Sequence, residues 1–217
     1  TLSSRSLRKM AYSSRTSSLP RASLLCGSVA SSEATSAQRS TLVAAWVRYW
    51  KKLIASVRER YSGRITYAAN WDEYLRIPFW RELDLIGIDA YFPLSEARDP
   101  GLEDLRNGWK PWKDEIQSLQ EDVGIPVLFT EYGYRSMDYT AKKPWLVDRN
   151  EEGVNLEAQA NAKRAIFEEF WNEDWFAGGF VWKWFIQHSQ AGGLSDNLIE
   201  RAADVMLKEG RPLVLVP

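Results

Sequence analysis

The alternation of apolar strand segments with amphipathic helices after residue 40 constrains the fold of this chain most strongly. Strands are expected at 64–71, 83–91, 125–134 and 176–185, and helices at 40–63, 73–82, 102–123 and 156–171. This order predicts strands that pair in parallel through helical crossovers. Two α/β architectures compete, a (β/α)8 barrel of the TIM type and an open doubly wound sheet. Because no Gly-rich phosphate-binding loop follows any strand, the barrel is favoured.

The length and charge of the chain limit the number of domains and the kinds of partner. With 217 residues, 45% of them apolar and 26% charged, one sizeable core and one domain are expected. The 28 basic and 29 acidic residues leave a formal charge of −1, which gives no basis for binding nucleic acid or an acidic membrane surface. No apolar run approaches the ~20 residues of a membrane span. Localisation and oligomeric state stay open.

Two residue types occur only once. Cys26 is the single cysteine and His188 the single histidine. An intrachain disulfide is therefore excluded, and a zinc site or a serine–histidine triad is disfavoured. Acid–base chemistry in this chain would fall to carboxylates.

The first 38 residues differ in composition from the rest. Residues 1–32 contain five basic residues, no acidic residue and many serines. An organelle transit peptide, a disordered segment and a segment read out of frame would all have this composition. We therefore expect an atypical Ser/Arg-rich segment at 1–38 and a folded domain at 39–217.

The segment Ile125–Tyr134 ends an apolar strand on a carboxylate. Strict alternation places Val127, Phe129 and Glu131 on one face, so a core stripe ends in a charge. In parallel α/β folds, active sites lie at the carboxyl ends of strands. Glu131 is therefore a candidate catalytic carboxylate; the alternative is that it caps the following loop.

The two preceding strands also end on polar and aromatic residues. In the strand at 83–91, Asp89 and Tyr91 share a face, while Ile86 and Ile88 point toward the covering helices. Tyr91 could orient a neighbouring carboxylate, or both residues could satisfy loop backbone. The strand at 64–71 ends on Asn70 and Trp71, which suit a sugar hydroxyl and a sugar ring. Helix capping is the alternative role for Asn70.

Aromatic residues are abundant, with 11 Trp, 9 Tyr and 8 Phe. Their flat faces can cover the C–H faces of sugar rings, although most tryptophans of any domain pack in its core. Trp182 and Trp184 share one face of the last strand, where one of them could form the floor of a pocket. Core packing explains the pair equally well.

Four segments resemble one known family. YAANWDEY, DLIGIDAYFPL, GIPVLFTEYGYRS and GGFVWKWF are similar, in this order, to the carboxyl-terminal part of glycoside hydrolase family 113, the β-mannanase-like retaining (β/α)8 enzymes. The resemblance covers about residues 40–190 and implies an incomplete barrel with strands four to eight recognisable. It implies that Glu131 is the nucleophile. Substrate-binding residues are then expected at the strand ends, namely Asn70, Trp71, Asp89, Tyr91, Tyr132, Trp182 and Trp184.

The resemblance also requires a second carboxylate. Retaining hydrolysis uses two carboxyl groups about 5 to 5.5 Å apart and no metal or cofactor. The acid/base of such barrels ends strand four in a Gly-x-Glu pattern, whereas here Glu33, the one carboxylate available, lies six residues after Gly27. Reading this segment one base earlier could restore the pattern with permitted codons. Glu33 is therefore the candidate acid/base, at a spacing from Gly27 that differs from the motif.

The expected function is hydrolysis of β-linked, mannan-type oligo- or polysaccharides by a two-carboxylate double displacement. The first alternative is a catalytically inactive carbohydrate-binding remnant that keeps the aromatic cleft and lacks the acid. The second is an unstable fragment, because a barrel without strands one to three would expose two sheet edges.

Overall fold

The computed structural model describes residues 36–146 and 153–182 of the chain. Its elements are, in chain order, α3 (Ser36–Arg58), β1 (Thr66–Asn70), the 3-10 turns Tyr74–Arg76 and Trp80–Glu82, β2 (Leu85–Asp89), α4 (Leu102–Val123), β3 (Val127–Tyr132), α5 (Leu156–Phe170) and β4 (Phe176–Val181). The predicted candidate acid/base Glu33 and the predicted pocket residue Trp184 lie outside the described residues, as do Cys26 and His188.

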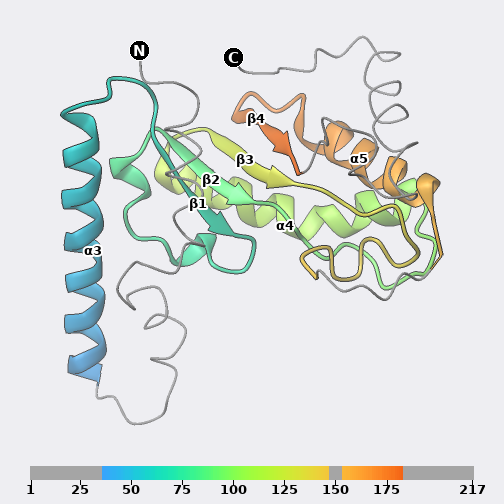
Figure 1. The fold of residues 1–217 in the computed structure, drawn as a ribbon, viewed down its shortest axis with the longest axis horizontal. Helices are drawn as coiled ribbons and strands as arrows, with labels where there is room; N and C mark the ends of the chain where they lie inside the picture. The colour runs from blue at the N-terminus through green and yellow to red at the C-terminus, as the bar shows by residue number, and fades with distance from the viewer. Residues whose placement is uncertain (1–35, 147–152, 183–217) are drawn as a thin grey trace, which may run out of the picture.

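The four strands form one sheet in the order β1-β2-β3-β4, and every neighbouring pair is parallel (Figure 1). Helix α4 connects β2 to β3, and α5 connects β3 to β4. The alternation in the sequence therefore correctly predicted a parallel α/β fold. Two short 3-10 turns, rather than a helix, connect β1 to β2.

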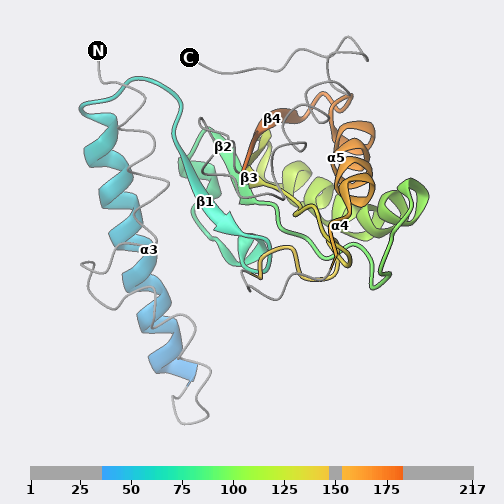
Figure 2. The same ribbon diagram turned by 45° about the vertical axis from the view of Figure 1, so that its right-hand side comes forward.

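All three helices cover the same face of the sheet. Tyr67 of β1 and Phe129 of β3 lie on one face, because Tyr67 is in register with Ile86 and Phe129 with Ile88. The Tyr67 ring contacts Trp50 of α3 at 5.0 Å between centroids. The Phe129 ring contacts α4 and α5. In Figure 2, α4 and α5 lie together on one side of the sheet and α3 lies beyond β1.

One-sided covering distinguishes the two predicted architectures. A doubly wound sheet carries helices on both faces, whereas a (β/α)8 barrel carries them only outside. The opposite face of this sheet, which includes Thr66, Gly87 and Leu128, corresponds to the barrel interior. The described residues thus form four strands of a TIM-barrel-type fold, compared with the eight of a complete barrel.

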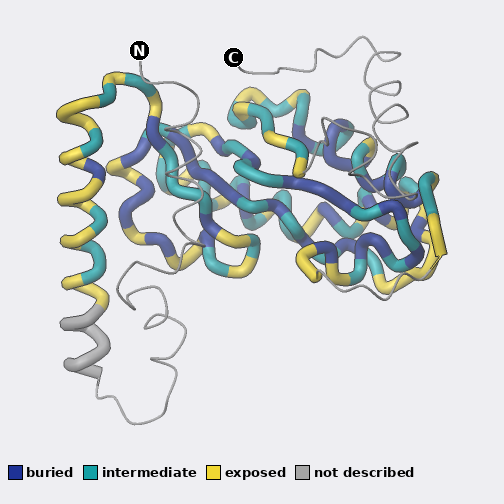
Figure 3. The backbone as a smooth tube through the Cα atoms, viewed as in Figure 1, coloured by how far each residue is buried: buried dark blue, intermediate teal, exposed yellow. Residues whose placement is uncertain are grey.

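The core lies between the sheet and α4 and α5 (Figure 3). Its centre is an aromatic cluster in which Trp109 of α4 packs against Phe92, Phe129 and Phe170, with ring centroids 5.0 to 6.0 Å apart. All four side chains are fully buried. Burial of four large aromatic side chains makes this cluster a large hydrophobic contribution to the stability of the domain.

Helix α4 runs unbroken from Leu102 to Val123, although it contains Gly108 and Pro111. A Cβ atom on Gly108 would lie 2.1 Å from the carbonyl oxygen of Leu94. Gly108 therefore lets α4 pack closely against the loop after β2, a contact that any larger residue would prevent. The helix ends at Gly124, whose φ of 79° is left-handed and suits glycine.

The prediction of one helix at 73–82 is wrong. The structure has two 3-10 turns there, separated by Ile77 and Pro78, and Ile77 is extended with ψ of 110°. A proline disfavours helical backbone at the residue before it and supplies no N–H donor. Pro78 therefore divides the segment.

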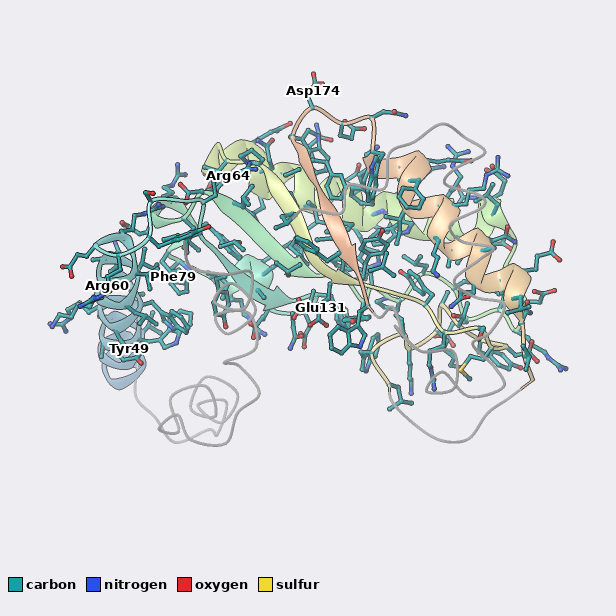
Figure 4. The ribbon with its side chains drawn as sticks, turned by 45° about the horizontal axis from the view of Figure 1, so that its top comes forward. Tyr49, Arg60, Arg64, Phe79, Glu131 and Asp174 are labelled. Atoms are coloured by element: carbon teal, nitrogen blue, oxygen red, sulfur yellow. The ribbon has the colours of Figure 1, made fainter. Side chains whose placement is uncertain are left out.

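Helix α3 packs on the residues between β1 and β2 through aromatic rings. Trp50 stacks on Phe79 with centroids 5.4 Å apart, and Figure 4 shows Phe79 beside the helix. Ion pairs from Lys51 to Glu82 and from Arg58 to Asp84 border this contact. Within the described part of the chain, no helix has the length and apolar character needed to cross a membrane.

Candidate active site

Three polar residues form a row across the carboxyl ends of the strands. Asn70 of β1 is in register with Asp89 of β2, and Asp89 is in register with Glu131 of β3. Figure 4 shows Glu131 at the end of the sheet where the strands terminate. The structure thus brings together three of the residues predicted from separate sequence segments.

A β-bulge determines which face Glu131 occupies. Ile88 pairs with Phe129, but the next residue, Asp89, pairs with Glu131, so Thr130 is the extra residue on β3. Without the bulge Glu131 would point toward the helices with Phe129. With it, Glu131 lies beside Asp89 on the interior face of the sheet. The predicted shared face of Val127, Phe129 and Glu131 is therefore wrong, because one inserted residue re-aims the side chain.

Tyr91 holds the Glu131 carboxylate. Its phenol O–H donates a hydrogen bond to Oε2 of Glu131 at 2.9 Å, and both side chains are half-buried. A hydrogen bond donated to a carboxylate fixes its orientation. Among the described residues, no lysine or arginine pairs with Glu131. Tyr91 thus sets the position of the carboxylate oxygens.

The bulge also connects β3 to β2. The hydroxyl of the extra residue, Thr130, donates to Oδ1 of Asp89 at 2.9 Å, and the backbone N–H of Ala90 donates to the carbonyl oxygen of Glu131 at 2.6 Å. Asp89 is therefore committed to bracing the strand ends, a role that the sequence analysis left open. Thr130 was not predicted, since nothing in the sequence marks a bulge.

At the end of β1, Asn70 and Trp71 are available to a ligand. The Asn70 side chain is exposed. The 3-10 turn that follows begins at Tyr74, and Glu73, not Asn70, occupies its capping position. Capping, the alternative role considered for Asn70, is therefore not observed. Trp71 is half-buried and stacks on Trp145, with centroids 4.7 Å apart and ring planes 26° apart.

Tyr132 and Trp182 flank Glu131 differently. Tyr132 is only 1% exposed and packs against Trp171, and burial raises the pKa of its phenol. Its ring belongs to the core, so we leave it out of the proposed pocket. Trp182 is 43% exposed, and its backbone N–H donates to the carbonyl oxygen of Tyr132 at 2.7 Å. Trp182 therefore lies beside the strand that carries Glu131.

Gly133 permits this close approach. A Cβ atom there would lie 2.1 Å from the carbonyl oxygen of Trp182. The glycine that breaks the strand after Glu131 thus has a packing reason, because it lets the ends of β3 and β4 meet. Among the described residues, no group of His, Cys, Asp and Glu could hold a metal ion.

Comparison with known proteins gives one family. The sequence pattern of glycoside hydrolase family 113 matches residues 37–197, which is most of the chain. The chain therefore belongs to glycoside hydrolase family 113. No curated protein matches it significantly.

Solved structures agree with this assignment. The β-mannanase AaManA from Alicyclobacillus acidocaldarius, in complex with ManMIm, has 27% sequence identity and a TM-score of 0.60 over 74% of this chain. Two structures of a family 113 β-1,4-mannanase, one of them a complex, have 22% and 23% identity and a TM-score of 0.55 over 71% of it. This chain covers 49% of the protein chain in each of these three structures, and thus spans about half its length.

Proposed function

We propose that this chain carries the nucleophile of a retaining glycoside hydrolase that cleaves β-linked, mannan-type polysaccharides. One observation carries the proposal: Glu131 sits at the carboxyl end of a parallel strand, aimed by a bulge toward the barrel interior and held there by Tyr91. The family and its mannanase structures support the class of substrate.

In the proposed reaction, a carboxylate oxygen of Glu131 attacks the anomeric carbon and displaces the glycosidic oxygen. A second carboxyl group protonates that oxygen as it leaves, and a water molecule then hydrolyses the glycosyl-enzyme ester. Tyr91 orients the attacking carboxylate. In this proposal Asn70, Trp71 and Trp182 contact the sugar, and the reaction uses neither a metal nor a cofactor. Glu33 remains the proposed acid/base outside the described residues.

Two substrates applied to the purified chain test this proposal. An aryl β-mannoside with a strongly acidic phenol needs no proton for its leaving group, whereas soluble β-1,4-mannan does. Hydrolysis of both, with the β-anomer as the first product in a proton NMR time course, is the expected result. First formation of the α-anomer would contradict retention.

The alternative function is that of a carbohydrate-binding remnant, and the exposed side chain of Trp182 at the end of β4 is the observation that favours it. If only the aryl mannoside is cleaved, Glu131 works without an acid. If a chain shown by circular dichroism to be folded cleaves neither substrate but binds mannan, the remnant is the better description.

The role of Tyr91 gives a prediction of its own. Replacing Tyr91 by Phe removes the hydrogen bond to Glu131, so we expect kcat/KM to fall about tenfold to a hundredfold, the loss typical of a bond to a charged group. Because Tyr91 orients the attacking oxygen, the loss should appear in kcat more than in KM.

A matched control is Tyr134→Phe. The buried hydroxyl of Tyr134 donates to the carbonyl oxygen of Phe92 at 3.1 Å, so the same chemical change removes a hydrogen bond outside the site. It should lower stability without lowering kcat. Equal losses of kcat for the two variants would show that Tyr91 does not act on Glu131.

A further inference from the structure

The loop after β3 places an exposed tryptophan at the end of a different strand. Trp145 belongs to the loop that follows Glu131, yet its ring stacks on Trp71, which directly follows β1. One face of the Trp145 ring is thus covered by Trp71. The side chain nevertheless keeps 39% of its surface exposed, so its other face is open to solvent.

The stacked pair rests on fixed supports. Edge-on contacts join Trp71 to Trp112 at 5.8 Å and to Phe92 at 6.1 Å. Trp112 is itself anchored through its indole N–H, which donates to the carbonyl oxygen of Pro93 at 3.0 Å. Helix α4 and the loop after β2 therefore hold Trp71 in place beneath Trp145.

The loop that carries Trp145 is braced along its course. Two backbone hydrogen bonds join it to the loop after β2. The N–H of Leu94 donates to the carbonyl oxygen of Ala141 at 2.9 Å, and the N–H of Tyr139 donates to the carbonyl oxygen of Arg98 at 2.7 Å. Lys142 adds an ion pair with Glu96 at 2.7 Å. These contacts lead the loop across the end of β2 toward β1, so the position of Trp145 is built into the fold.

The ring of Trp145 is already fixed from beneath by Trp71, so a ligand could stack on its exposed surface with little loss of side-chain entropy. Among the described residues, neither indole N–H of the stacked pair hydrogen-bonds to the protein, so these polar edges are also available. A flat apolar face with a polar rim is the surface that stacks on the C–H face of a sugar ring.

The position of the pair relative to Glu131 indicates which sugar ring it would hold. Trp71 follows Asn70, in the row that includes Asp89 and Glu131, and β1 and β3 are separated by one strand. Two strand spacings amount to roughly 10 Å. A ring stacked on Trp145 would therefore differ from the ring attacked by Glu131.

We propose that the open face of Trp145, supported by Trp71, is a platform for a sugar ring of the polysaccharide chain away from the bond that is cleaved. This proposal rests on the proposed function, since it assumes that the same polysaccharide lies over Glu131. Its consequence is a preference for longer oligosaccharides, because a short one bound over Glu131 does not reach the platform.

Calorimetric titration of the full chain carrying Glu131→Gln, which prevents turnover, tests the platform. Adding Trp145→Ala should weaken binding of mannohexaose about threefold to tenfold, the value of one aromatic stacking contact, and leave that of mannobiose unchanged. Trp145→Phe should restore much of the lost affinity. The control is Leu146→Ala. Leu146 follows Trp145 and is 41% exposed but not aromatic, so no change in the affinity for mannohexaose is expected.

Three results would overturn the platform. The first is the same mannohexaose affinity with and without the Trp145 ring, and the second is no binding of mannohexaose before Trp145 is changed. The third is an equal loss of affinity for mannohexaose and mannobiose, which would contradict a distal site. Cleavage of the aryl mannoside by the unsubstituted chain tests the proposed function separately. The two ideas can therefore fail independently.

Discussion

Replacing Glu131 by Gln should lower kcat/KM for an aryl β-mannoside at least about a thousandfold while leaving the fold intact. The amide has the shape of the carboxylate, and its carbonyl oxygen can still accept the hydrogen bond from Tyr91. It cannot, however, attack an anomeric carbon as a carboxylate does. The free energy of unfolding should therefore stay within about 0.5 kcal/mol of the original, a change small enough to separate chemistry from stability.

Two additions make this experiment specific. Glu121→Gln is the matched control, because Glu121 is an exposed carboxylate on α4, and it should leave kcat/KM unchanged. Glu131→Ala, with a smaller side chain, should lose turnover and regain it with sodium azide. Azide can attack the anomeric carbon from the side that the carboxylate has vacated as the aryl oxide leaves. The product should be the α-mannosyl azide. A β-mannosyl azide would instead identify Glu131 as the acid/base, and full activity of Glu131→Gln would remove it from the mechanism.

Much of the fold could be predicted because local signals and tertiary packing agree. The expected helix at 102–123 matches α4 because its residues favour helix and Gly124 ends it in a left-handed conformation. Each of the four strands falls inside an expected segment, since short apolar runs bounded by Gly, Pro and Asp leave little alternative. Parallel pairing then follows from the order of the elements.

The geometry of the candidate site was harder to predict. Alternation placed Glu131 with Phe129, but the bulge at Thr130 moves it to the other face, and a bulge depends on how two strands pair rather than on either sequence. The contact between Trp71 and Trp145 joins residues 74 positions apart (145 minus 71) through a loop without periodicity. Sequence patterns thus predicted a site at the strand ends, whereas the orientation of its side chains required the tertiary structure.

The second large effect is expected in the core below the site. Phe129 lies two residues before Glu131, is fully buried, and contacts Phe170 and Phe176 with centroids 4.9 Å apart in each case. Replacing it by Ala removes these contacts and leaves a cavity between β3, α5 and β4. Such a change costs about 3 to 5 kcal/mol, a large share of the 5 to 15 kcal/mol by which domains are stable.

We therefore expect Phe129→Ala to shift the midpoint of urea unfolding strongly downward. Activity should be lost because the strand end that holds Glu131 unfolds, whereas Glu131→Gln should lose activity in a folded chain. Phe180→Ala is the matched control, because Phe180 of β4 is 46% exposed and the same substitution should cost well under 1 kcal/mol. Tryptophan fluorescence serves as the probe of unfolding for both variants. Equal losses of stability would contradict the packing of Phe129 in the core. If Phe129→Ala loses stability as expected and any remaining folded fraction keeps its specific activity, the core positions Glu131 only by keeping β3 folded.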